Sequence, residues 1–435
     1  MKVVTRIPAE VREFVDHVRT NPVDVYIFGA DIAGKIVKKV LDNHGIAIRG
    51  FVDNNKNKTD FVLDGVFVYH APDFIRDAKK DAVILIASTY ISDIIRQLED
   101  HGFYNWSPIV SFLELYDEAE YRKMLTGDLR KNHSGGEFTH DFDVFVLANM
   151  KNSQIKYLDE SKLYIRSIDI VITEKCSLKC QDCSNLMQYY EKPVDIEYEQ
   201  VRMEIDLITT AADEINELRI IGGDAFMNKN FPQIVNYAAS KPNVNKVVIY
   251  TNGTIAPNID RIREISKSDK IFVFITTYDA LSRNVDKLSA ALEENEIQYN
   301  RQPAYGWTDC GHIKKHDRDN EKQTYIFQNC CAKHFTTLTD SKLFRCPFAA
   351  NLHRLTATPD FADDYIELQD VTALSESDLQ AYRMRLKKYL REIAYIKYCD
   401  FCNGRTYGDP EIEPGIQTKA PLKYVMFERS KSETL

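Results

Sequence analysis

Three cysteines follow an apolar, β-branched run and lie close together in the sequence. The run is Ile170-Val-Ile-Thr, and Cys176, Cys180 and Cys183 follow it in a Cys-x3-Cys-x2-Cys pattern. Three thiolates on one loop can converge on a single small inorganic group, but a closed tetrahedral site needs four ligands. The pattern therefore predicts a strand-end loop that holds an iron–sulfur cluster with one iron open to a non-protein ligand.

Two other interpretations of these cysteines stay open. A zinc site would need a fourth ligand nearby in the sequence, and none follows Cys183 at the usual spacing. A redox-active pair formed by Cys180 and Cys183 would leave Cys176 without a role. Both alternatives explain less of the pattern than the cluster does.

From residue 163 onward, strand-like apolar runs alternate with runs whose apolar residues recur at helical spacing. This alternation predicts a parallel sheet covered by helices. Polar or glycine-rich stretches follow three of the strands, namely Gly222-Gly-Asp224, Thr251-Asn-Gly253 and Thr276-Thr-Tyr278. Parallel βα folds place their active sites at this end of the strands.

The cysteine loop followed one βα unit later by Gly222-Gly223-Asp224 resembles the signature of radical S-adenosylmethionine (SAM) enzymes. The resemblance spans roughly residues 163–417 and implies a partial (β/α)6 barrel. It also implies a [4Fe–4S] cluster on Cys176, Cys180 and Cys183, whose open iron binds SAM. In that family the cluster splits SAM reductively, and the resulting 5′-deoxyadenosyl radical abstracts a hydrogen from the substrate.

The resemblance also implies the residues that contact SAM. Gly222, Gly223 and Asp224 correspond to the family's Gly-Gly-Glu motif, whose acid accepts hydrogen bonds from the SAM ammonium group. Asn252 and Thr276 end the next two strands, where the family contacts the methionine or the ribose of SAM. Asp182 occupies a position near the adenine that is usually aromatic, so the sequence departs from the family there.

The remaining six cysteines all lie in the last third of the chain. Cys331, Cys346, Cys399 and Cys402 follow a spacing that resembles the auxiliary-cluster region called twitch, a relative of the SPASM region, in certain radical SAM dehydrogenases. The resemblance implies a second [4Fe–4S] cluster, since closing a cluster with protein ligands alone takes four cysteines. Residues 338–346 are typical of a β-hairpin that presents Cys346.

Three points about these cysteines stay open. Cys330 can replace Cys331, because adjacent residues point in different directions. Cys310 has no assigned role. Separate free thiols with one structural zinc are the alternative to a second cluster, because Cys-x2-Cys also suits zinc.

The N-terminal part shows a second βα series, with strand-like runs at residues 24–28, 46–52 and 82–87. The turn from Gly29 to Gly34, with Asp53 farther on, is a partial dinucleotide fingerprint in which Asp31 replaces the middle glycine. The series predicts a doubly wound parallel sheet. It resembles the small Rossmann-like domain attached to sugar-modifying and acyl-transferring enzymes, which holds a nucleotide or serves only for docking.

The predicted fold class is therefore α/β, with four parts. They are a doubly wound Rossmann-like domain (residues 1–115), a linker (116–162), a radical SAM partial barrel (163–305) and an auxiliary iron–sulfur region (306–435).

Composition narrows the range of partners. A net charge of −9 makes a nucleic-acid partner unlikely, because phosphate binding needs a basic surface. No apolar run is long enough to span a membrane, and the first residues lack the apolar core of a signal peptide. We therefore expect a cytoplasmic location, where the nine cysteines are ligands or free thiols rather than disulfides.

The resemblance implies a radical SAM oxidoreductase that oxidises or epimerises a small molecule such as a sugar or nucleotide-sugar. The auxiliary cluster would be its electron partner, and a flavodoxin or ferredoxin would be the external electron donor. Modification of a peptide is the alternative substrate class. The alternative from another functional class is a non-catalytic iron–sulfur or zinc protein that binds a nucleotide and senses redox state.

Overall fold

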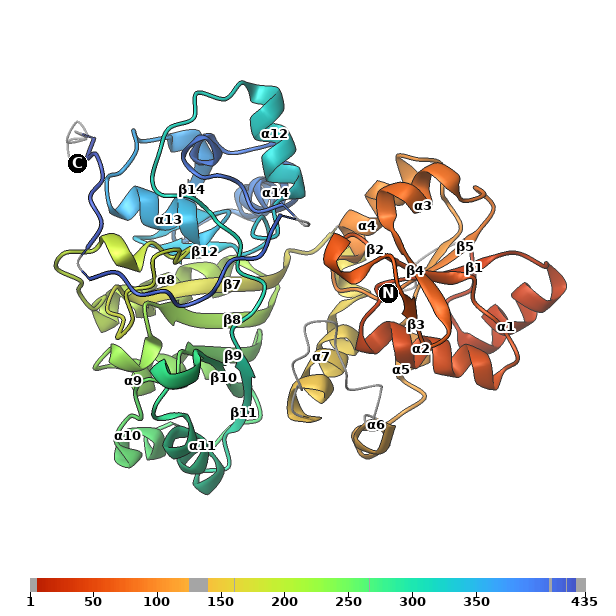
Figure 1. Ribbon diagram of the computed structural model, residues 1–435, viewed down its shortest axis with the longest axis horizontal. Helices are drawn as coiled ribbons and strands as arrows, with labels where there is room; N and C mark the ends of the chain where they lie inside the picture. Colours follow the sequence, from red (N-terminus) through yellow and green to blue (C-terminus); the bar gives the residue numbers. More distant parts are fainter. Residues whose placement is uncertain are drawn as a thin grey trace. The chain divides into compact units, whose positions relative to one another are not determined.

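The computed structural model divides into two compact units, Met1–Ser161 and Lys162–Leu435 (Figure 1). It describes residues 6–124, 140–159, 161–265, 267–406, 409–419 and 421–427. Part of the predicted linker (residues 125–139) and the last part of the predicted auxiliary region (residues 428–435) lie outside the described residues. Each unit is described by itself below.

The first unit alternates short strands with helices. Its main elements are α1 (Val11–Thr20), β1 (Val25–Phe28), α2 (Ile32–Asn43), β2 (Gly50–Asp53), β3 (Val62–Leu63), β4 (Val66–His70), α3 (Ala71–Asp77), β5 (Val83–Ile86), α4 (Ile91–Glu99), β6 (Trp106–Pro108), α5 (Val110–Leu113), α6 (Glu118–Met124) and α7 (His140–Ser153).

The sheet of the first unit has the strand order β3-β4-β2-β1-β5-β6. All neighbouring pairs are parallel except β3–β4. The chain begins in the middle at β1, moves outward through β2 and β4, and later continues on the other side of β1 with β5 and β6. Every residue of β5 is buried, as expected for a parallel strand covered on both faces.

Helices pack their apolar faces on this sheet. In α1 the buried residues Val11, Phe14, Val15 and Val18 recur at helical spacing, and the Phe14 ring meets Phe112 edge-to-face at 5.5 Å. Within the predicted linker, α7 buries Leu147 and Met150 in the same core. This part of the predicted linker therefore belongs to the first compact unit.

The second unit contains the longer sheet. Its elements are β7 (Tyr164–Thr173), α8 (Tyr198–Ala211), β8 (Glu214–Gly222), α9 (Phe231–Ala239), β9 (Val244–Thr251), α10 (Ile259–Arg263), β10 (Ile271–Thr277), α11 (Val285–Glu294), β11 (Gln298–Pro303), α12 (Asn320–Asn329), β12 (Thr337–Thr339), β13 (Lys342–Phe344), α13 (Pro347–Arg354), β14 (Tyr365–Glu367), α14 (Glu376–Arg391) and the 3₁₀ helix η8 (Lys397–Phe401).

The strand order of this sheet is β11-β10-β9-β8-β7-β12-β13-β14. Strands β7 to β11 are parallel and follow chain order, as the successive arrows in Figure 1 show. β12 pairs in parallel with the other side of β7, whereas β13 and β14 continue antiparallel. The prediction of an α/β chain with parallel sheets is therefore confirmed, and the Rossmann likeness and the barrel stay predictions.

The hairpin predicted near residue 340 is also confirmed. Leu338 of β12 pairs with Leu343 of β13, and Cys346 follows directly. The Cys346 side chain accepts from the Ala349 N–H and so caps the first turn of α13. The hairpin and the helix together fix the position of this cysteine.

Hydrophobic burial holds the second unit together. Val201, Ile205 and Ile208 of α8 and Val247 and Ile249 of β9 belong to one continuous core. Each of these side chains is fully buried, which stabilises the fold by about 1.5–3 kcal/mol per side chain. The strands whose ends carry the predicted site are therefore held in place by this buried core.

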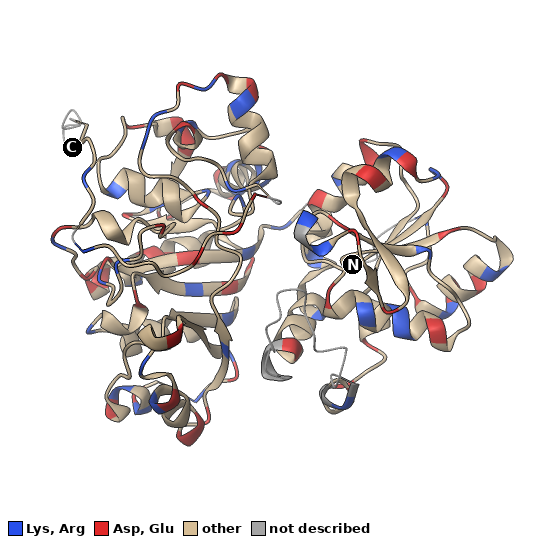
Figure 2. Ribbon diagram, viewed as in Figure 1, with Lys and Arg blue, Asp and Glu red and all other residues tan. Residues whose placement is uncertain are grey.

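Charged residues of both signs are scattered along the ribbon of each unit (Figure 2). Among the described residues, no helix is both long and apolar enough to cross a membrane.

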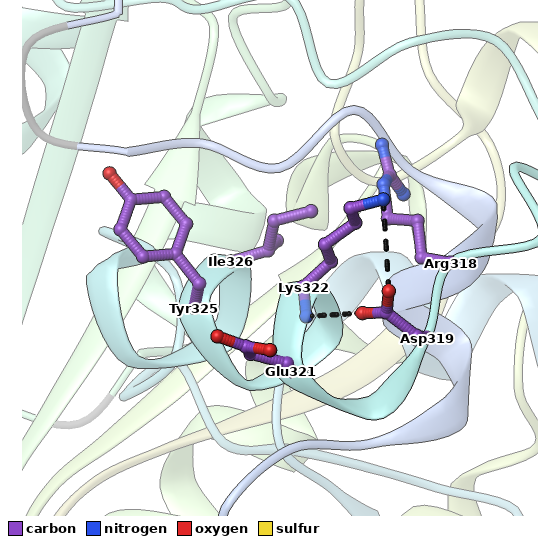
Figure 3. A pocket seen from close by; sticks show the side chains of 6 residues that line it. All are labelled: Arg318, Asp319, Glu321, Lys322, Tyr325 and Ile326. Carbon is purple, nitrogen blue, oxygen red and sulfur yellow. Dashed lines mark hydrogen bonds and ion pairs between the residues drawn. The ribbon is translucent and has the colours of Figure 1, made fainter.

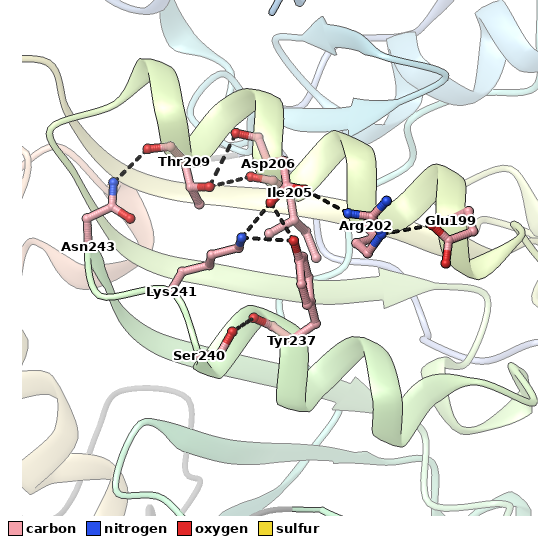
Figure 4. Close-up of polar contacts among 9 residues, drawn as sticks. All are labelled: Glu199, Arg202, Ile205, Asp206, Thr209, Tyr237, Ser240, Lys241 and Asn243. Atoms are coloured by element: carbon pink, nitrogen blue, oxygen red, sulfur yellow. Dashed lines mark hydrogen bonds and ion pairs between the residues drawn. The ribbon is translucent and has the colours of Figure 1, made fainter. Parts of the chain in front are cut away.

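A polar cluster ties α8 to α9 on the outside of the sheet (Figure 4). The Asp206 carboxylate accepts from the Tyr237 hydroxyl at 2.6 Å, from Arg202 Nη1 at 3.2 Å and from the Lys241 ammonium. Burial alone would raise the pKa of Asp206, but the hydrogen bonds from Lys241 and Tyr237 outweigh burial and lower the pKa. This carboxylate therefore stabilises the fold in its charged form.

We expect Asp206→Asn to lower the free energy of unfolding near pH 7 by about 0.5–1 kcal/mol, because the site is partly exposed and solvent screens the lost attraction. The folded-state pKa is lowered, so the loss is fully present above the unfolded carboxyl pKa of about 4 and shrinks as the pH falls below it. Urea unfolding at a series of pH values measures this difference. Asp260→Asn, in an exposed pair with Arg263, is the control, and an equal loss in both variants would contradict the prediction.

Candidate functional site

The predicted motifs gather at one edge of the second sheet. Thr173, at the end of β7, lies opposite Gly222, at the end of β8. Thr251, at the end of β9, lies opposite Ile275 of β10, one residue before Thr276. The cysteine loop and the three polar stretches therefore begin at neighbouring strand ends, as the parallel pattern predicts.

The two glycines of Gly222-Gly223 allow the cysteine loop to approach β8 closely. A Cβ at Gly222 would lie 2.1 Å from the Thr173 carbonyl oxygen, and one at Gly223 would lie 2.2 Å from the Lys175 carbonyl oxygen. The Gly223 N–H in turn donates to Thr173 O at 3.0 Å. No side chain fits at either position without moving the backbone that leads to Cys176.

Asp224 is buried and links the ends of β8 and β9. Its carboxylate accepts from the Thr251 hydroxyl at 2.9 Å, from the Asn252 N–H at 3.0 Å and from the Phe226 N–H at 3.1 Å. Burial raises the pKa of Asp224, and the hydrogen bonds from Asn252 and Thr251 oppose this shift. Asp224 therefore fixes the position of the end of β8 relative to the end of β9.

Asn252 connects this network to the cysteine loop. Its Nδ2 donates to the Ser177 hydroxyl at 3.2 Å and lies 3.6 Å from Cys176 Sγ. Its Oδ1 accepts from the Thr254 N–H at 3.0 Å, and the Thr254 and Ser177 hydroxyls bond to each other. An amide N–H is thus directed at the first sulfur of the predicted cluster.

The three thiols of the loop lie close enough to influence one another. Burial raises the pKa of Cys176, and the negative charges of Asp224, Cys183 and Cys180 raise it further. Burial likewise raises the pKa of Cys180 to about 11, and Cys183 adds to the effect. A cationic metal group would compensate for this crowding, so the donor set fits an iron–sulfur cluster.

Two residues near the thiols were not among the predicted site residues. Gln417, which is 237 positions after Cys180, donates from Nε2 to Cys180 Sγ at 3.2 Å. Tyr278 follows β10; burial raises the pKa of its hydroxyl, and the three loop cysteines raise it further. No local pattern marks Gln417, whereas Tyr278 stands next to a strand end that the sequence did single out.

The other predicted SAM residues lie at the rim of this group. Thr276 is half-buried on β10, opposite Gln302 of β11. Asp182 is also half-buried; burial raises its pKa, and Asp309 raises it further while His312 opposes. Asp182 therefore faces the segment that follows β11.

The C-terminal cysteines also come together, from several elements. Cys399 lies in η8 and Cys402 follows that helix, while the sulfur of Cys402 accepts from the Gly404 N–H at 3.2 Å. Burial raises the pKa of Cys399, and Cys402 and Cys346 raise it further. Burial raises the pKa of Cys346 to about 11, with Cys402 adding to the effect. These three thiols therefore form a second group.

The adjacent thiols of Cys330 and Cys331 interact with each other and with the charged groups around them. A hydrogen bond with Cys331 and burial raise the pKa of Cys330, and Cys402 and Cys346 raise it further. The pKa of Cys331 is lowered, first by the hydrogen bond with Cys330 and also by Arg405. Cys331 is held on another side by its backbone N–H, which donates to Arg405 O at 2.8 Å.

Arg405 lies between the two groups of cysteines. Burial alone would lower its pKa, but the thiols of Cys331, Cys310, Cys330 and Cys402 raise it. Burial raises the pKa of Cys183 in the first group, and Arg405 is one of the groups that oppose this shift. Its Nε donates to the Thr308 hydroxyl at 3.1 Å, and no carboxylate of the described residues forms an ion pair with it.

One apolar cluster surrounds both groups. It contains buried aromatic residues such as Tyr189, Phe344 and Tyr398, and cysteines of both groups pack against it. Among the described residues, no three or more His, Cys, Asp or Glu side chains are arranged to hold a single metal ion. A cubane cluster gives each thiolate its own iron, so its ligands stand farther apart than the ligands of one ion.

A surface hollow of ≈ 470 Å³ lies beside α12 (Figure 3). Its lining residues are Arg318, Asp319, Glu321, Lys322, Tyr325 and Ile326. The Arg318 guanidinium donates to the carbonyl oxygens of Cys399 at 3.1 Å and Cys402 at 2.8 Å. The hollow therefore adjoins the outer side of the second cysteine group.

The glycine turn of the first unit is occupied by its own carboxylates. Asp31 caps α2 by accepting from the Ile32 N–H, and Lys58 pairs with it at 2.8 Å. Asp53 accepts from the Ala30 N–H at 3.2 Å and the Asn55 N–H at 2.8 Å. A phosphate at this helix end would have to replace Asp31, so nucleotide binding by this unit stays a prediction.

Comparison with known families bears directly on the second unit. Residues 170–291 match the family model of the Radical SAM superfamily. The chain carries a radical SAM domain. The match contains the three loop cysteines and every predicted SAM contact, and it ends before the C-terminal cysteines. In the first unit, residues 23–108 match the family described as C2185-like, N-terminal.

Curated relatives of this chain are named GTP 3′,8-cyclases. The protein from Psychromonas ingrahamii is 31% identical over 107 residues, which are 24% of this chain and 30% of the relative. The protein from Syntrophomonas wolfei is 28% identical over 104 residues, which are 22% of this chain and 30% of the relative. The chain thus spans less than a third of the length of these two relatives.

Solved structures resemble this chain more distantly. BtrN in complex with AdoMet and 2-DOIA is 14% identical, covers 57% of this chain and 97% of its own, and has a TM-score of 0.34. SuiB from Streptococcus suis bound to S-adenosylmethionine is 15% identical, covers 36% of each chain, and has a TM-score of 0.26.

We expect Gly223→Ala to displace the cysteine loop, because the added Cβ would lie 2.2 Å from Lys175 O and 2.7 Å from the Cys176 Cβ. Burial now raises the pKa of Cys176. Partial exposure should return the pKa toward its ordinary value, so alkylation of this thiol should become roughly tenfold faster for each pKa unit recovered. Mass spectrometry of the alkylated apo-protein measures the rate at each cysteine.

Gly102→Ala is the matched control for this change. A Cβ at Gly102 meets nothing within 4 Å, although its φ of +83° makes alanine cost about 1–2 kcal/mol. The control should lower stability without changing the Cys176 rate. An unchanged rate in Gly223→Ala would show that the loop does not depend on the close approach.

Proposed function

We propose that this chain is a radical SAM oxidoreductase with two [4Fe–4S] clusters, which oxidises or epimerises a small molecule such as a sugar or nucleotide-sugar. One observation carries the proposal. The loop of Cys176, Cys180 and Cys183 lies at the same sheet edge as Asp224 and Asn252, within a radical SAM domain. Three thiols from one loop leave the fourth position of a cluster for SAM.

The first cluster, with SAM on its open iron, would supply the electron that cleaves SAM and starts hydrogen abstraction from the substrate. Asp224 would hold the strand ends that shape the SAM site. Its two oxygens already accept from three donors, Thr251, Asn252 and Phe226, which leaves about one of the four lone-pair sites of the carboxylate for SAM. Gly222, Gly223, Asn252, Thr276 and the Asp182 backbone would form the remaining contacts.

The second cluster would be held by Cys346, Cys399 and Cys402 with Cys330 as the fourth ligand. Cys330 is favoured over Cys331 because its sulfur lies within the electrostatic reach of Cys346 and Cys402. The shared apolar cluster would exclude water from both clusters. A flavodoxin or ferredoxin would deliver the reducing electron from outside.

The half-buried guanidinium of Arg405 supports a substrate with an anionic group. It lies among cysteines of both groups and has no carboxylate partner in the described part of the chain. Guanidinium groups suit phosphate and carboxylate. The phosphate of a nucleotide-sugar would satisfy this requirement, and a peptide carboxylate is the alternative.

The decisive experiment is anaerobic reconstitution followed by addition of dithionite and SAM. We expect about eight iron atoms per chain, four for each cluster, and formation of 5′-deoxyadenosine. Cys183→Ala should remove about four irons and abolish SAM cleavage, whereas Cys399→Ala should remove the other four and leave SAM cleavage largely intact. About one zinc and no iron in the unmodified protein would point to the non-catalytic alternative.

Matched serine variants identify the fourth ligand of the second cluster. We expect Cys330→Ser to lose about four of the eight irons after reconstitution, because serine replaces a cluster thiolate, and Cys331→Ser to retain them. Iron analysis and the visible absorption of the clusters measure both outcomes. The reverse pattern would assign Cys331 as the ligand.

A further inference from the structure

The segment after residue 408 returns to the cysteine loop. We call residues 409–419 and 421–427 the C-terminal strap. Its backbone pairs with the loop on both sides of Cys180, since the Gln181 N–H donates to Ile416 O and the Thr418 N–H donates to Lys179 O, each at 2.7 Å. A short antiparallel bridge between Cys180 and Gln417 results.

The side-chain amide of Gln417 both accepts and donates hydrogen bonds at this bridge. Its Oε1 accepts from the Lys179 N–H at 2.7 Å. Its Nε2 donates to Cys180 Sγ at 3.2 Å and to Gly415 O at 2.7 Å. Because a backbone N–H can only donate, the oxygen must face Lys179, and the NH₂ group must then face the sulfur.

Other contacts hold the strap in this position. The Ile412 N–H donates to Trp307 O and the Leu422 N–H donates to Gln188 O, each at 2.8 Å. Gly415 lies against Tyr278, where a Cβ would be 2.8 Å from the ring, and its φ of +79° favours glycine. The strap is therefore anchored on both sides of Gln417.

Hydrogen bonds to cluster sulfurs change the reduction potential of an iron–sulfur cluster. An N–H directed at a thiolate stabilises negative charge, so it favours the reduced cluster. We propose that Gln417 is a positioning residue for the first cluster: it orients the Cys180 thiolate and raises the reduction potential of the cluster when the strap is seated. This role rests on the proposed function.

The test is a redox titration of the reconstituted 435-residue chain, followed by electron paramagnetic resonance. A Cys399→Ala background removes the second cluster, so that only the first contributes. Gln417→Glu keeps the side-chain length and the acceptor for the Lys179 N–H, but turns a carboxylate oxygen toward the sulfur. We expect a more negative potential, with a roughly tenfold lower ratio of reduced to oxidised cluster at a fixed solution potential.

Gln417→Met removes the donor without adding charge, so its shift should have the same sign and be smaller. Gln188→Met is the matched control, because Gln188 Nε2 donates to the carbonyl oxygens of Gln181 and Cys183 in the same loop but to no sulfur. Its potential should equal that of the parent. Iron loss to a chelator should also be faster in the Gln417 variants than in the control.

Three outcomes would contradict the role of Gln417 or the proposed function, and they can be told apart. Equal potentials in all variants would overturn the role of Gln417. An equal shift in Gln188→Met would also overturn it, since loosening of the loop would then explain the effect. Absence of any iron–sulfur cluster in the unmodified protein would refute the proposed function itself.

Discussion

The buried carboxylate of Asp224 is the contact on which the candidate site depends. It joins the end of β8 to the end of β9 through Thr251 and Asn252. Leaving these donors unpaired away from water would be costly, because buried polar groups need partners. With the strand ends fixed, Gly222 and Gly223 let the loop of Cys176 lie directly above them. The Gly-Gly-Asp sequence therefore shapes the site through contacts within the protein, without the help of a ligand.

Local sequence patterns predicted most of the elements around this site. The polar stretches Gly222-Gly-Asp224, Thr251-Asn-Gly253 and Thr276-Thr-Tyr278, which were expected to follow strands, begin at or just before the last residues of β8, β9 and β10. This agreement follows from the apolar runs that precede them, which are typical of buried strands. The hairpin before Cys346 was equally predictable from the sequence, because turn residues separate its short strands.

Contacts between distant segments could not be predicted in this way. Gln417 has no neighbour in sequence that marks it, and its partner is 237 residues away. The choice between Cys330 and Cys331 likewise depends on how the end of α12 is oriented by the bridge between Cys330 and Thr406. Such information lies in tertiary packing, which a single sequence does not encode in any local pattern.

The cysteine loop and the C-terminal strap, which meet at the first site, are synthesised at different times. Cys180 and Gln417, whose amide donates to the Cys180 sulfur, are 237 residues apart. Ribosomes add about 5–20 residues each second, so the loop exists for roughly 10–50 s before Gln417 has been synthesised. During that interval the nascent chain carries all three loop thiols without the amide that faces Cys180. Metal loading at this early stage would meet a more open loop than the finished protein presents.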